Sequence, residues 1–257
     1  MNLATTVHGA ANGALPVLIA HGLFGSGRNW GVIAKRLSND RQVITVDMRN
    51  HAESPWAESH SYPDLAGDLA GVVAAHGGCA DVIGHSMGGK AAMVLALTAP
   101  ERVRKLLVAD IAPVGYGHTQ SQLIAAMRAV DLTRVNKRSD ADAQLASKVE
   151  DPAVRAFLLQ SLDVPGKRWR LNFDVLDREM DRIIGFPEIE GRFDGPTLFL
   201  SGGASDYVLP EYRPKIRALF PHAHFAKIPG TGHWLHAEKP HDFEAAARVF
   251  LDAPEAA

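Results

Sequence analysis

The stretch "VIGHSMGGK", residues 82–90, decides the fold class of this chain. It follows an apolar run, leads into a helical pattern, and has glycine two positions before and two positions after Ser86. Glycine at these positions permits a tight strand-to-helix turn in which neighbouring backbone would clash with larger side chains. This is the context of a nucleophile elbow, which exposes a serine at the end of a strand. Ser86 is therefore the candidate nucleophile, and an ordinary tight turn is the alternative.

Short apolar runs recur on both sides of this stretch, and each ends in glycine, aspartate or proline. Because they are nearly continuous rather than alternating, they predict strands that are covered on both faces, as in a parallel sheet. Helical patterns begin at residues 30, 62, 88 and 242, between or after these runs. The alternation predicts an α/β protein with an open, mostly parallel, doubly wound sheet and a ligand site beyond the carboxyl ends of its strands. The runs are "PVLIAHG" from 16, "QVITVD" from 42, "ADVIGHS" from 80, "KLLVADIAP" from 105, "PTLFLSGG" from 196 and "AHFAKIPG" from 223.

The alternation of predicted strands and helices is interrupted between Ala109 and Pro196. Residues 112–190 contain several helical patterns, with start signals such as "SDADAQL" and "DPAVRAFLLQSL", and no convincing strand. We expect a helical cap over residues 112–190, inserted into an α/β core made of residues 1–111 and 191–257. Above the strand ends, such a cap would shape a pocket and exclude water.

The composition favours a small-molecule partner. The 257 residues include 27 Lys and Arg against 29 Asp and Glu, and no basic stretch is interleaved with aromatic residues, so nucleic acid is not an expected partner. One cysteine, Cys79, rules out an internal disulfide and fits a reducing compartment. The sequence begins without a signal-peptide pattern and has no long uncharged apolar segment, so we expect a cytoplasmic protein without membrane contact.

A histidine at the same end of the predicted sheet is the candidate base. His233 lies in "GTGHWLHAEKP", residues 230–240, in a loop after the last apolar run. A loop at this place can carry an imidazole toward Ser86, in the chain order serine, acid, histidine. His236, three residues later, is interpreted as a surface or helix-start residue.

Backbone N–H groups near the elbow can stabilise a developing oxyanion. Met87 begins the predicted helix after the elbow, where N–H groups are free and positively polarised. The segment "HGLFGS", residues 21–26, follows the first strong strand and offers a second donor, the N–H of Leu23.

Further residues near these loops are candidates for the substrate pocket. They are His21, Phe24, His85 and Trp234. His222 and His224 form an H-x-H pair, but no third ligand lies nearby in the sequence, so we expect no metal site.

Two carboxylates compete to orient His233. Asp206, in "SGGASDYVLP", follows the next-to-last apolar run and matches the commonest hydrolase arrangement. Asp110, in "VADIAP", ends the strand that follows the elbow helix, where burial and fixed hydrogen bonds would hold the imidazole tautomer. The residues alone leave both acids open.

Together the motifs "HGLFGS", "VDMRNHAESP", "GHSMGGK", "VADIAPVGY" and "GTGHWLHAEKP" resemble the α/β-hydrolase family, and within it the YbfF-type bacterial esterases and their mitochondrial relatives. The resemblance runs from about residue 16 to 250, with Ala52 where the family pattern "RNHG" has glycine. It implies hydrolysis of carboxylic esters or thioesters, of acyl-CoA type in some members, without a cofactor. The resembled branch takes its acid from the position of Asp110 and has a non-acidic residue at that of Asp206. We therefore favour Asp110 and keep Asp206 as the alternative acid or a turn residue.

The sequence thus predicts a serine carboxylesterase or thioesterase that works through an acyl-enzyme. A cofactor-free haloperoxidase or perhydrolase with the same triad is one alternative, and a non-catalytic ligand-binding protein of the same fold is another. Dehalogenase and epoxide hydrolase functions are excluded because they need a carboxylate in place of Ser86.

Overall fold

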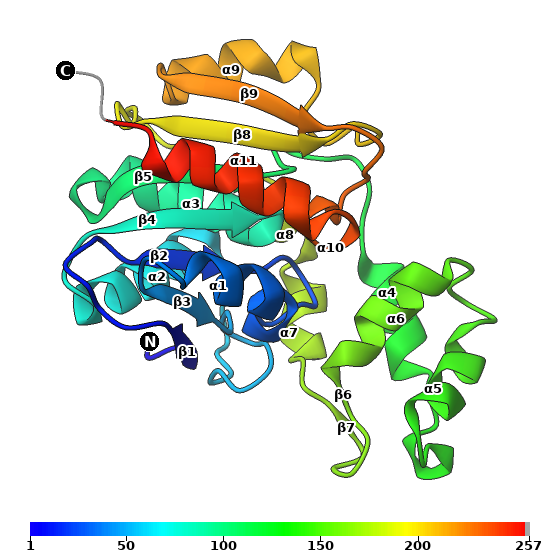
Figure 1. Ribbon diagram of the computed structural model, residues 1–257. Coiled ribbons are helices and arrows are strands. Elements are labelled where there is room, and N and C mark those ends of the chain that lie inside the picture. Colours follow the sequence, from blue (N-terminus) through cyan, green and yellow to red (C-terminus); the bar gives the residue numbers. More distant parts are fainter. Residues whose placement is uncertain (255–257) are drawn as a thin grey trace.

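The computed structural model describes residues 1–254 and has a seven-stranded sheet at its centre (Figure 1). The strand order is β1-β3-β2-β4-β5-β8-β9, and every neighbouring pair is parallel except β1 and β3. This confirms the predicted α/β class and the mostly parallel sheet. The strands are β1 (Thr5–His8), β2 (Val17–Ala20), β3 (Val43–Val46), β4 (Ala80–His85), β5 (Val103–Ala109), β8 (Thr197–Gly202) and β9 (Ala223–Ile228).

Helices cover both faces of the sheet, and each face has its own apolar core. On one face, Trp30, Ile33 and Phe243 belong to a buried cluster with alternate residues of the strands, such as Val17 and Ile19. The buried cluster on the other face is larger. It includes residues of the helix that follows Ser86, of its neighbouring helices and of the insertion. The first face carries α1 (Gly31–Leu37) and α11 (Pro240–Asp252), with the short α10 (Leu235–Glu238) before α11; the second carries α2 (Tyr62–Ala75), α3 (Met87–Thr98) and α9 (Arg213–Leu219).

The apolar runs all form strands, and those inside the sheet are covered on both faces, as their nearly continuous apolar character predicts; β9, at the edge, is largely exposed. Residues of β2, β3, β4 and β8 are buried throughout. Strand β1, "TTVH", was not predicted from the sequence. It pairs antiparallel at the edge of the sheet and is largely exposed, so it carries no long apolar signal.

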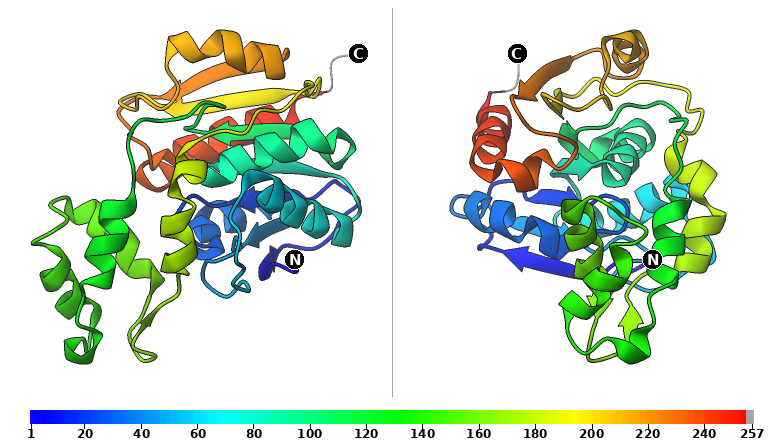
Figure 2. Two further views of the ribbon diagram at one scale, coloured as in Figure 1. Left: turned by 180° about the vertical axis from the view of Figure 1, so that it is seen from behind. Right: turned by 90° about the vertical axis from the view of Figure 1, so that its right-hand side faces the viewer.

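The segment between β5 and β8 is mostly helical and lies beyond the carboxyl ends of the strands (Figures 1 and 2). We propose that residues 112–190 act as a cap on the core formed by residues 1–111 and 191–257. Its helices are α4 (Ser121–Arg128), α5 (Arg138–Leu145), α6 (Pro152–Leu158), α7 (Phe173–Arg178) and α8 (Met180–Ile184).

The expectation of no strand in this segment was wrong at one place. Strands β6 (Leu162–Asp163) and β7 (Arg168–Trp169) form a small antiparallel hairpin. Each has two residues, too few for an alternating pattern, and the connecting turn is formed by Pro165, Gly166 and Lys167, which has a positive φ of 49°.

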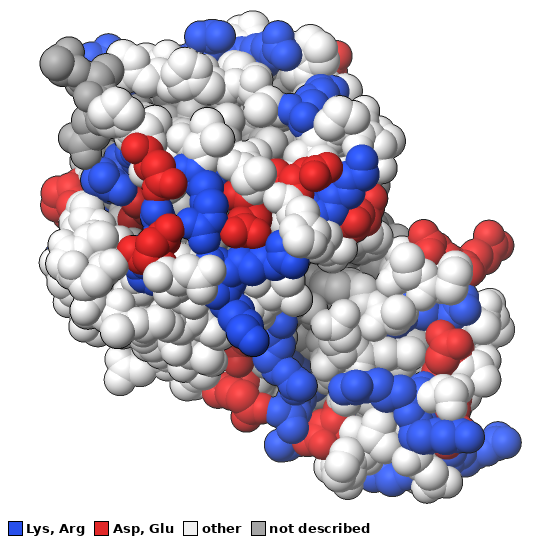
Figure 3. Space-filling model, viewed as in Figure 1, with Lys and Arg blue, Asp and Glu red and all other residues white. Residues whose placement is uncertain are grey.

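The surface carries both signs of charge. Figure 3 shows Lys and Arg side chains interspersed with Asp and Glu over the core and the insertion, in keeping with the nearly balanced composition. Within residues 1–254, no helix combines the length and the apolar character needed to cross a membrane.

Candidate active site

Ser86 occupies a strained turn between β4 and α3. Its backbone has φ 51° and ψ −120°, a conformation that side-chain-bearing residues rarely adopt. A Cβ atom on Gly84 would lie 2.4 Å from the carbonyl oxygen of Gly88, and one on Gly88 would lie 2.4 Å from that of Ala20. Neither contact is tolerable, so both glycines are required by the close approach of backbone. The elbow predicted from the sequence is therefore formed.

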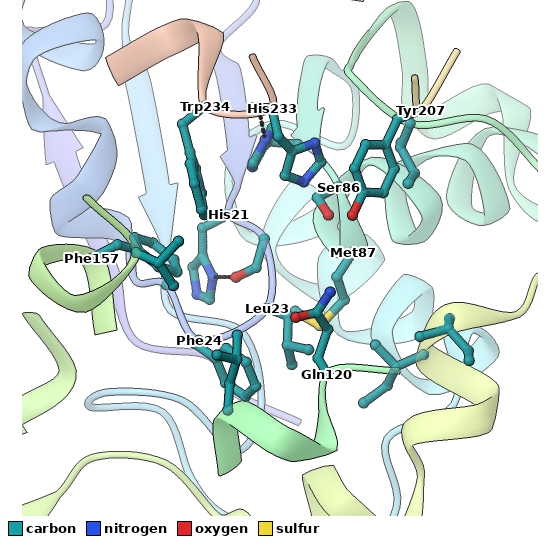
Figure 4. A pocket seen from close by; sticks show the side chains of 18 of the residues that line it. His21, Leu23, Phe24, Ser86, Met87, Gln120, Phe157, Tyr207, His233 and Trp234 are labelled. Atoms are coloured by element: carbon teal, nitrogen blue, oxygen red, sulfur yellow. Dashed lines mark hydrogen bonds between the residues drawn. The ribbon is translucent and has the colours of Figure 1, made fainter. Parts of the chain in front are cut away.

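His233 and Asp110 meet at the carboxyl end of the sheet. Asp110 directly follows β5, and His233 lies in the loop between β9 and α10. The Nδ1 atom of His233 lies 2.8 Å from Oδ2 of Asp110, and the Asp110 side chain is completely buried. Because Nδ1–H donates to the carboxylate, the Nε2 lone pair remains available for a proton from Ser86. Figure 4 shows Ser86 and His233 close together, both lining one cavity.

The second candidate acid lies in a different environment. Asp206 is exposed, and no hydrogen bond or ion pair involves its side chain in the part of the chain that the structure describes. Its neighbour Ser205 instead donates from Oγ to Oδ2 of Asp110 at 2.5 Å, and the Gly202 N–H donates to Oδ1 of Asp110 at 2.9 Å. The end of β8 and the loop after it therefore reach the site through Gly202 and Ser205, and both residues donate hydrogen bonds to Asp110 rather than placing Asp206 there.

Backbone donors for an oxyanion lie on both sides of Ser86. Met87 is the first residue of α3, and the first N–H groups of a helix have no intrahelical partner. The Leu23 loop lies against the elbow, since a Cβ atom on Gly22 would lie 3.2 Å from Cβ of Ser86. The N–H groups of Phe24 and Gly25 have partners, whereas none of the described hydrogen bonds uses the N–H of Leu23.

Two buried histidines hold this loop in place. The Nδ1–H of His21 donates to the Gly22 carbonyl at 2.8 Å, and its Nε2 accepts from the Met48 N–H at 2.9 Å. His51 Nε2 accepts from the N–H of Phe24, whose φ is +64°. Burial lowers the pKa of His21 to about 4 and that of His51 to about 3, so both rings are neutral acceptors at neutral pH.

Two further rings pack against His233. The Tyr207 ring stacks on the imidazole with centroids 4.1 Å apart, and burial raises the pKa of Tyr207 to about 12. His85 Nε2 lies 2.8 Å from the His233 carbonyl oxygen, and burial holds the pKa of His85 well below its usual value. His233 is thus fixed at its backbone, its ring face and its Nδ1 atom.

The cavity in front of Ser86 has a volume of about 440 Å³. All four predicted pocket residues line it, namely His21, Phe24, His85 and Trp234. On one side of Ser86 its wall is apolar, where Phe157 of α6 approaches Trp234 with ring centroids 5.5 Å apart (Figure 4). The lining also includes Lys90 and Tyr116.

Sequence reasoning missed Ser205, Tyr207 and Lys90 at this site. Ser205 and Tyr207 flank Asp206, so the sequence pattern did point to the loop that contains them, but to a different residue in it. Lys90 follows the elbow by one helical turn and is 1% exposed. It lies in a helix that is otherwise apolar nearly all round, a composition that indicates burial on every face.

The interpretation of His236 as a surface residue was wrong, although it does lie in the first turn of α10. It is 6% exposed and stacks on Trp30 with ring centroids 4.1 Å apart. Burial lowers the pKa of His236 to about 3. The described residues contain no group of three His, Cys, Asp or Glu side chains that could hold a metal ion, and this includes the surroundings of His222 and His224.

Comparisons with known proteins identify the family of this chain. The family model described as alpha/beta hydrolase fold matches residues 16–240. The chain is 44% identical over 249 residues to a mouse protein named sn-1-specific diacylglycerol lipase ABHD11, covering 92% of this chain and 81% of that protein. It is 42% identical over 239 residues to Esterase YbfF of Escherichia coli K12, covering 92% and 93%.

A solved structure described as a marine microorganism esterase superposes with a TM-score of 0.91 at 36% identity, covering 97% of this chain and 99% of the other. The resemblance drawn from the sequence motifs is thereby confirmed. This chain belongs to the alpha/beta hydrolase family and has YbfF-type esterases among its relatives.

Proposed function

We propose that this chain is a serine esterase that cleaves carboxylic esters through an acyl-enzyme intermediate. The observation that carries the proposal is the hydrogen bond of 2.8 Å between His233 and the buried Asp110, beside a serine on a strained elbow. The names of the relatives, esterase and diacylglycerol lipase, support the same reaction class. Thioesters share the electrophilic acyl carbon and are a second proposed substrate class.

In the proposed first half-reaction, Ser86 Oγ attacks the acyl carbon while His233 Nε2 removes its proton. The N–H groups of Leu23 and Met87 stabilise the oxyanion of the tetrahedral intermediate, and loss of one such donor typically costs about 2.7–4 kcal/mol. Asp110 keeps the imidazole in the required tautomer and stabilises the imidazolium. The C–O or C–S bond then breaks, and the leaving group takes the proton from His233.

In the second half-reaction, water attacks the acyl-enzyme. His233 removes a proton from the water and returns it to Ser86 as the acid product leaves. The chain's own residues suffice for both halves, so the proposal invokes no cofactor.

The test is hydrolysis of p-nitrophenyl butyrate together with covalent labelling by a fluorescent phosphonate. We expect wild type to turn over and to be labelled, and Ser86→Ala to do neither while keeping its circular dichroism spectrum. Wild type that binds short-chain esters without hydrolysis or labelling would support the non-catalytic alternative. Peroxide-dependent bromination that far exceeds ester hydrolysis would support the haloperoxidase or perhydrolase alternative.

A further inference from the structure

Lys90 is a buried lysine whose contacts the proposed reaction does not use. It lies on α3, one helical turn after Ser86, and its backbone N–H donates to the Ser86 carbonyl at 3.0 Å. Its ammonium donates to the carbonyl oxygens of Ile184 at 2.8 Å and Gly185 at 2.5 Å. Among the described residues no carboxylate forms an ion pair with it. Burial of a cation without an ion pair costs free energy, so the groups that do contact this ammonium are those that compensate for the lost water.

The two carbonyls that Lys90 binds belong to the end of α8, where the chain leaves the insertion. The last carbonyls of a helix have no intrahelical partner and need donors from elsewhere. Tyr62 of α2 supplies another donor, since its hydroxyl lies 2.6 Å from the Ile183 carbonyl oxygen. Side chains of two core helices therefore bind three consecutive carbonyls of this outgoing connection.

The chain that enters the insertion lies beside the same point. The Tyr116 N–H donates to the Ile184 carbonyl at 3.0 Å, and a Cβ atom on Gly115 would lie 3.9 Å from Cα of Gly185. The Lys90 ammonium is 4.8 Å from the centre of the Tyr116 ring, within range of a cation–π contact. Lys90 thus contacts both connections between the core and the insertion.

We propose that Lys90, with Tyr62 and Tyr116, forms a hinge clasp that fixes the position of the cap relative to Ser86. The expected effect of the clasp on ester kinetics rests on the proposed function, whereas its expected effect on the position of the cap does not. Lys90 is a positioning residue in this account. Because it shares a helix with Ser86 and lines the cavity, the clasp sets the width of the cavity and leaves the reactivity of the serine unchanged.

The two hydrogen bonds from Lys90 to the carbonyls do not depend on a permanent charge, whereas the cation–π contact with Tyr116 does. Burial lowers the pKa of Lys90 to about 7. An uncharged amine still carries two N–H groups, enough for both carbonyls. The substitution that removes the clasp must therefore remove the N–H donors, as Lys90→Met does while keeping an unbranched apolar chain of similar length.

Lys105 provides a matched control. It is equally buried, at 1% exposure, and donates to the carbonyls of Phe250 at 3.1 Å, Leu251 at 2.8 Å and Ala253 at 2.5 Å. It lies near the start of β5, and it binds the end of α11 rather than the cap. Lys105→Met removes a comparable set of hydrogen bonds at a place remote from Ser86.

The experiment combines steady-state kinetics, phosphonate labelling and hydrogen exchange for wild type, Lys90→Met and Lys105→Met. In Lys90→Met we expect KM for p-nitrophenyl butyrate to rise at least about tenfold, the size expected for one lost hydrogen bond to a charged group. The maximal labelling rate of Ser86, measured at saturating phosphonate so that weaker binding does not contribute, should stay within about twofold of wild type. Amides of residues 121–184 should exchange faster than in wild type, and those of β4 and β5 should not.

Lys105→Met should lower the melting temperature and leave both KM and cap exchange unchanged. Equal exchange of residues 121–184 in wild type and Lys90→Met would overturn the clasp, even if no ester were hydrolysed. A labelling rate that falls as far as kcat would also overturn it, because Lys90 would then act on the serine itself. If Lys90→Met does not fold, Tyr62→Phe removes one donor and keeps the ring, and it should shift KM and exchange in the same direction by less.

Discussion

The Asp110 carboxylate accepts hydrogen bonds from three donors on two different segments of the chain. His233 comes from the loop after β9, and Ser205 and Gly202 come from the end of β8 and the loop after it. The three donors fix the orientation of the fully buried carboxylate, and its Oδ2 atom accepts from the Nδ1–H of His233. The geometry of the base thus depends on residues that never touch the substrate.

Removal of the Ser205 hydroxyl tests this dependence. Ser205→Ala deletes one donor to a buried carboxylate, so we expect kcat for p-nitrophenyl butyrate to fall about tenfold, with KM little changed. Ser201→Ala is the control, since its hydroxyl contacts the Ala226 carbonyl at 3.5 Å and does not reach Asp110. If the two variants had equal kcat, Ser205 would have no positioning role.

The individual residues that sequence could and could not predict differ in a physical way. Ser86, His233 and the two candidate acids, Asp110 and Asp206, were proposed because each ends a strand or follows one, and strand ends meet at one edge of a parallel sheet. The preference for Asp110 came with the family resemblance. Ser205 and Tyr207 act through contacts across neighbouring loops, which depend on loop conformation. His236 was misinterpreted because its burial depends on Trp30, more than 200 positions away in the chain.

At the scale of the elements, the turn between β4 and α3 carries the strictest requirement. A Cβ atom on Gly84 would lie within 2.7 Å of the backbone of both Gly88 and Gly89. We expect Gly84→Ala to lose most of its soluble, folded protein, because backbone on both sides of the turn would have to move.

Gly71, in helix α2, serves as the control glycine for the comparison with Gly84. It is exposed, and a Cβ atom there would meet nothing within 4 Å. Gly71→Ala should therefore raise the free energy of unfolding by about 0.5–1 kcal/mol, as alanine does in a helix interior. Thermal unfolding checks both variants, and a stable Gly84→Ala protein with wild-type activity would contradict the account of the elbow.

The elements that sequence could predict are those with a strong apolar signal. The runs at 16, 42, 80, 105 and 196 became strands that are buried on both faces, where few polar positions occur. The run at 223 became β9, which lies at the edge of the sheet and is largely exposed. Edge strand β1 and the β6–β7 hairpin escaped prediction since they are short and partly exposed. The mainly helical insertion between β5 and β8 could be expected from the break in the pattern, but the hydrogen bonds of Lys90 to the end of α8 could not.

At the scale of the whole molecule, buried neutral histidines link stability to pH. Burial lowers the pKa of His21 to about 4, and that of both His51 and His236 to about 3. In the unfolded chain these groups titrate near 6.5, so below that pH the unfolded state binds more protons than the folded state. Stability is therefore lost as pH falls from about 6.5, by about 1.4 kcal/mol per pH unit for each such histidine.

Urea unfolding at pH 7 and pH 5 measures this effect. We expect the free energy of unfolding to fall by at least about 4 kcal/mol between the two. His236→Phe keeps a ring against Trp30 and removes one titrating group. Its free energy of unfolding should therefore change less steeply with pH, by the slope that corresponds to about one proton. His222→Gln, at an exposed position, should leave the slope unchanged. A slope shared by wild type and His236→Phe would contradict the assignment.

The central claim, a serine esterase whose His233 is oriented by Asp110, is tested most directly by comparing two acids. The measurement is kcat for p-nitrophenyl butyrate in wild type, Asp110→Asn and Asp206→Asn, with Ser86→Ala as the floor and circular dichroism as the check on folding. The account predicts that Asp110→Asn falls on the order of 10⁴-fold, close to the Ser86→Ala floor, while Asp206→Asn keeps most of its activity. A loss in Asp206→Asn with Asp110→Asn still active would contradict the account and assign the acid to the loop after β8.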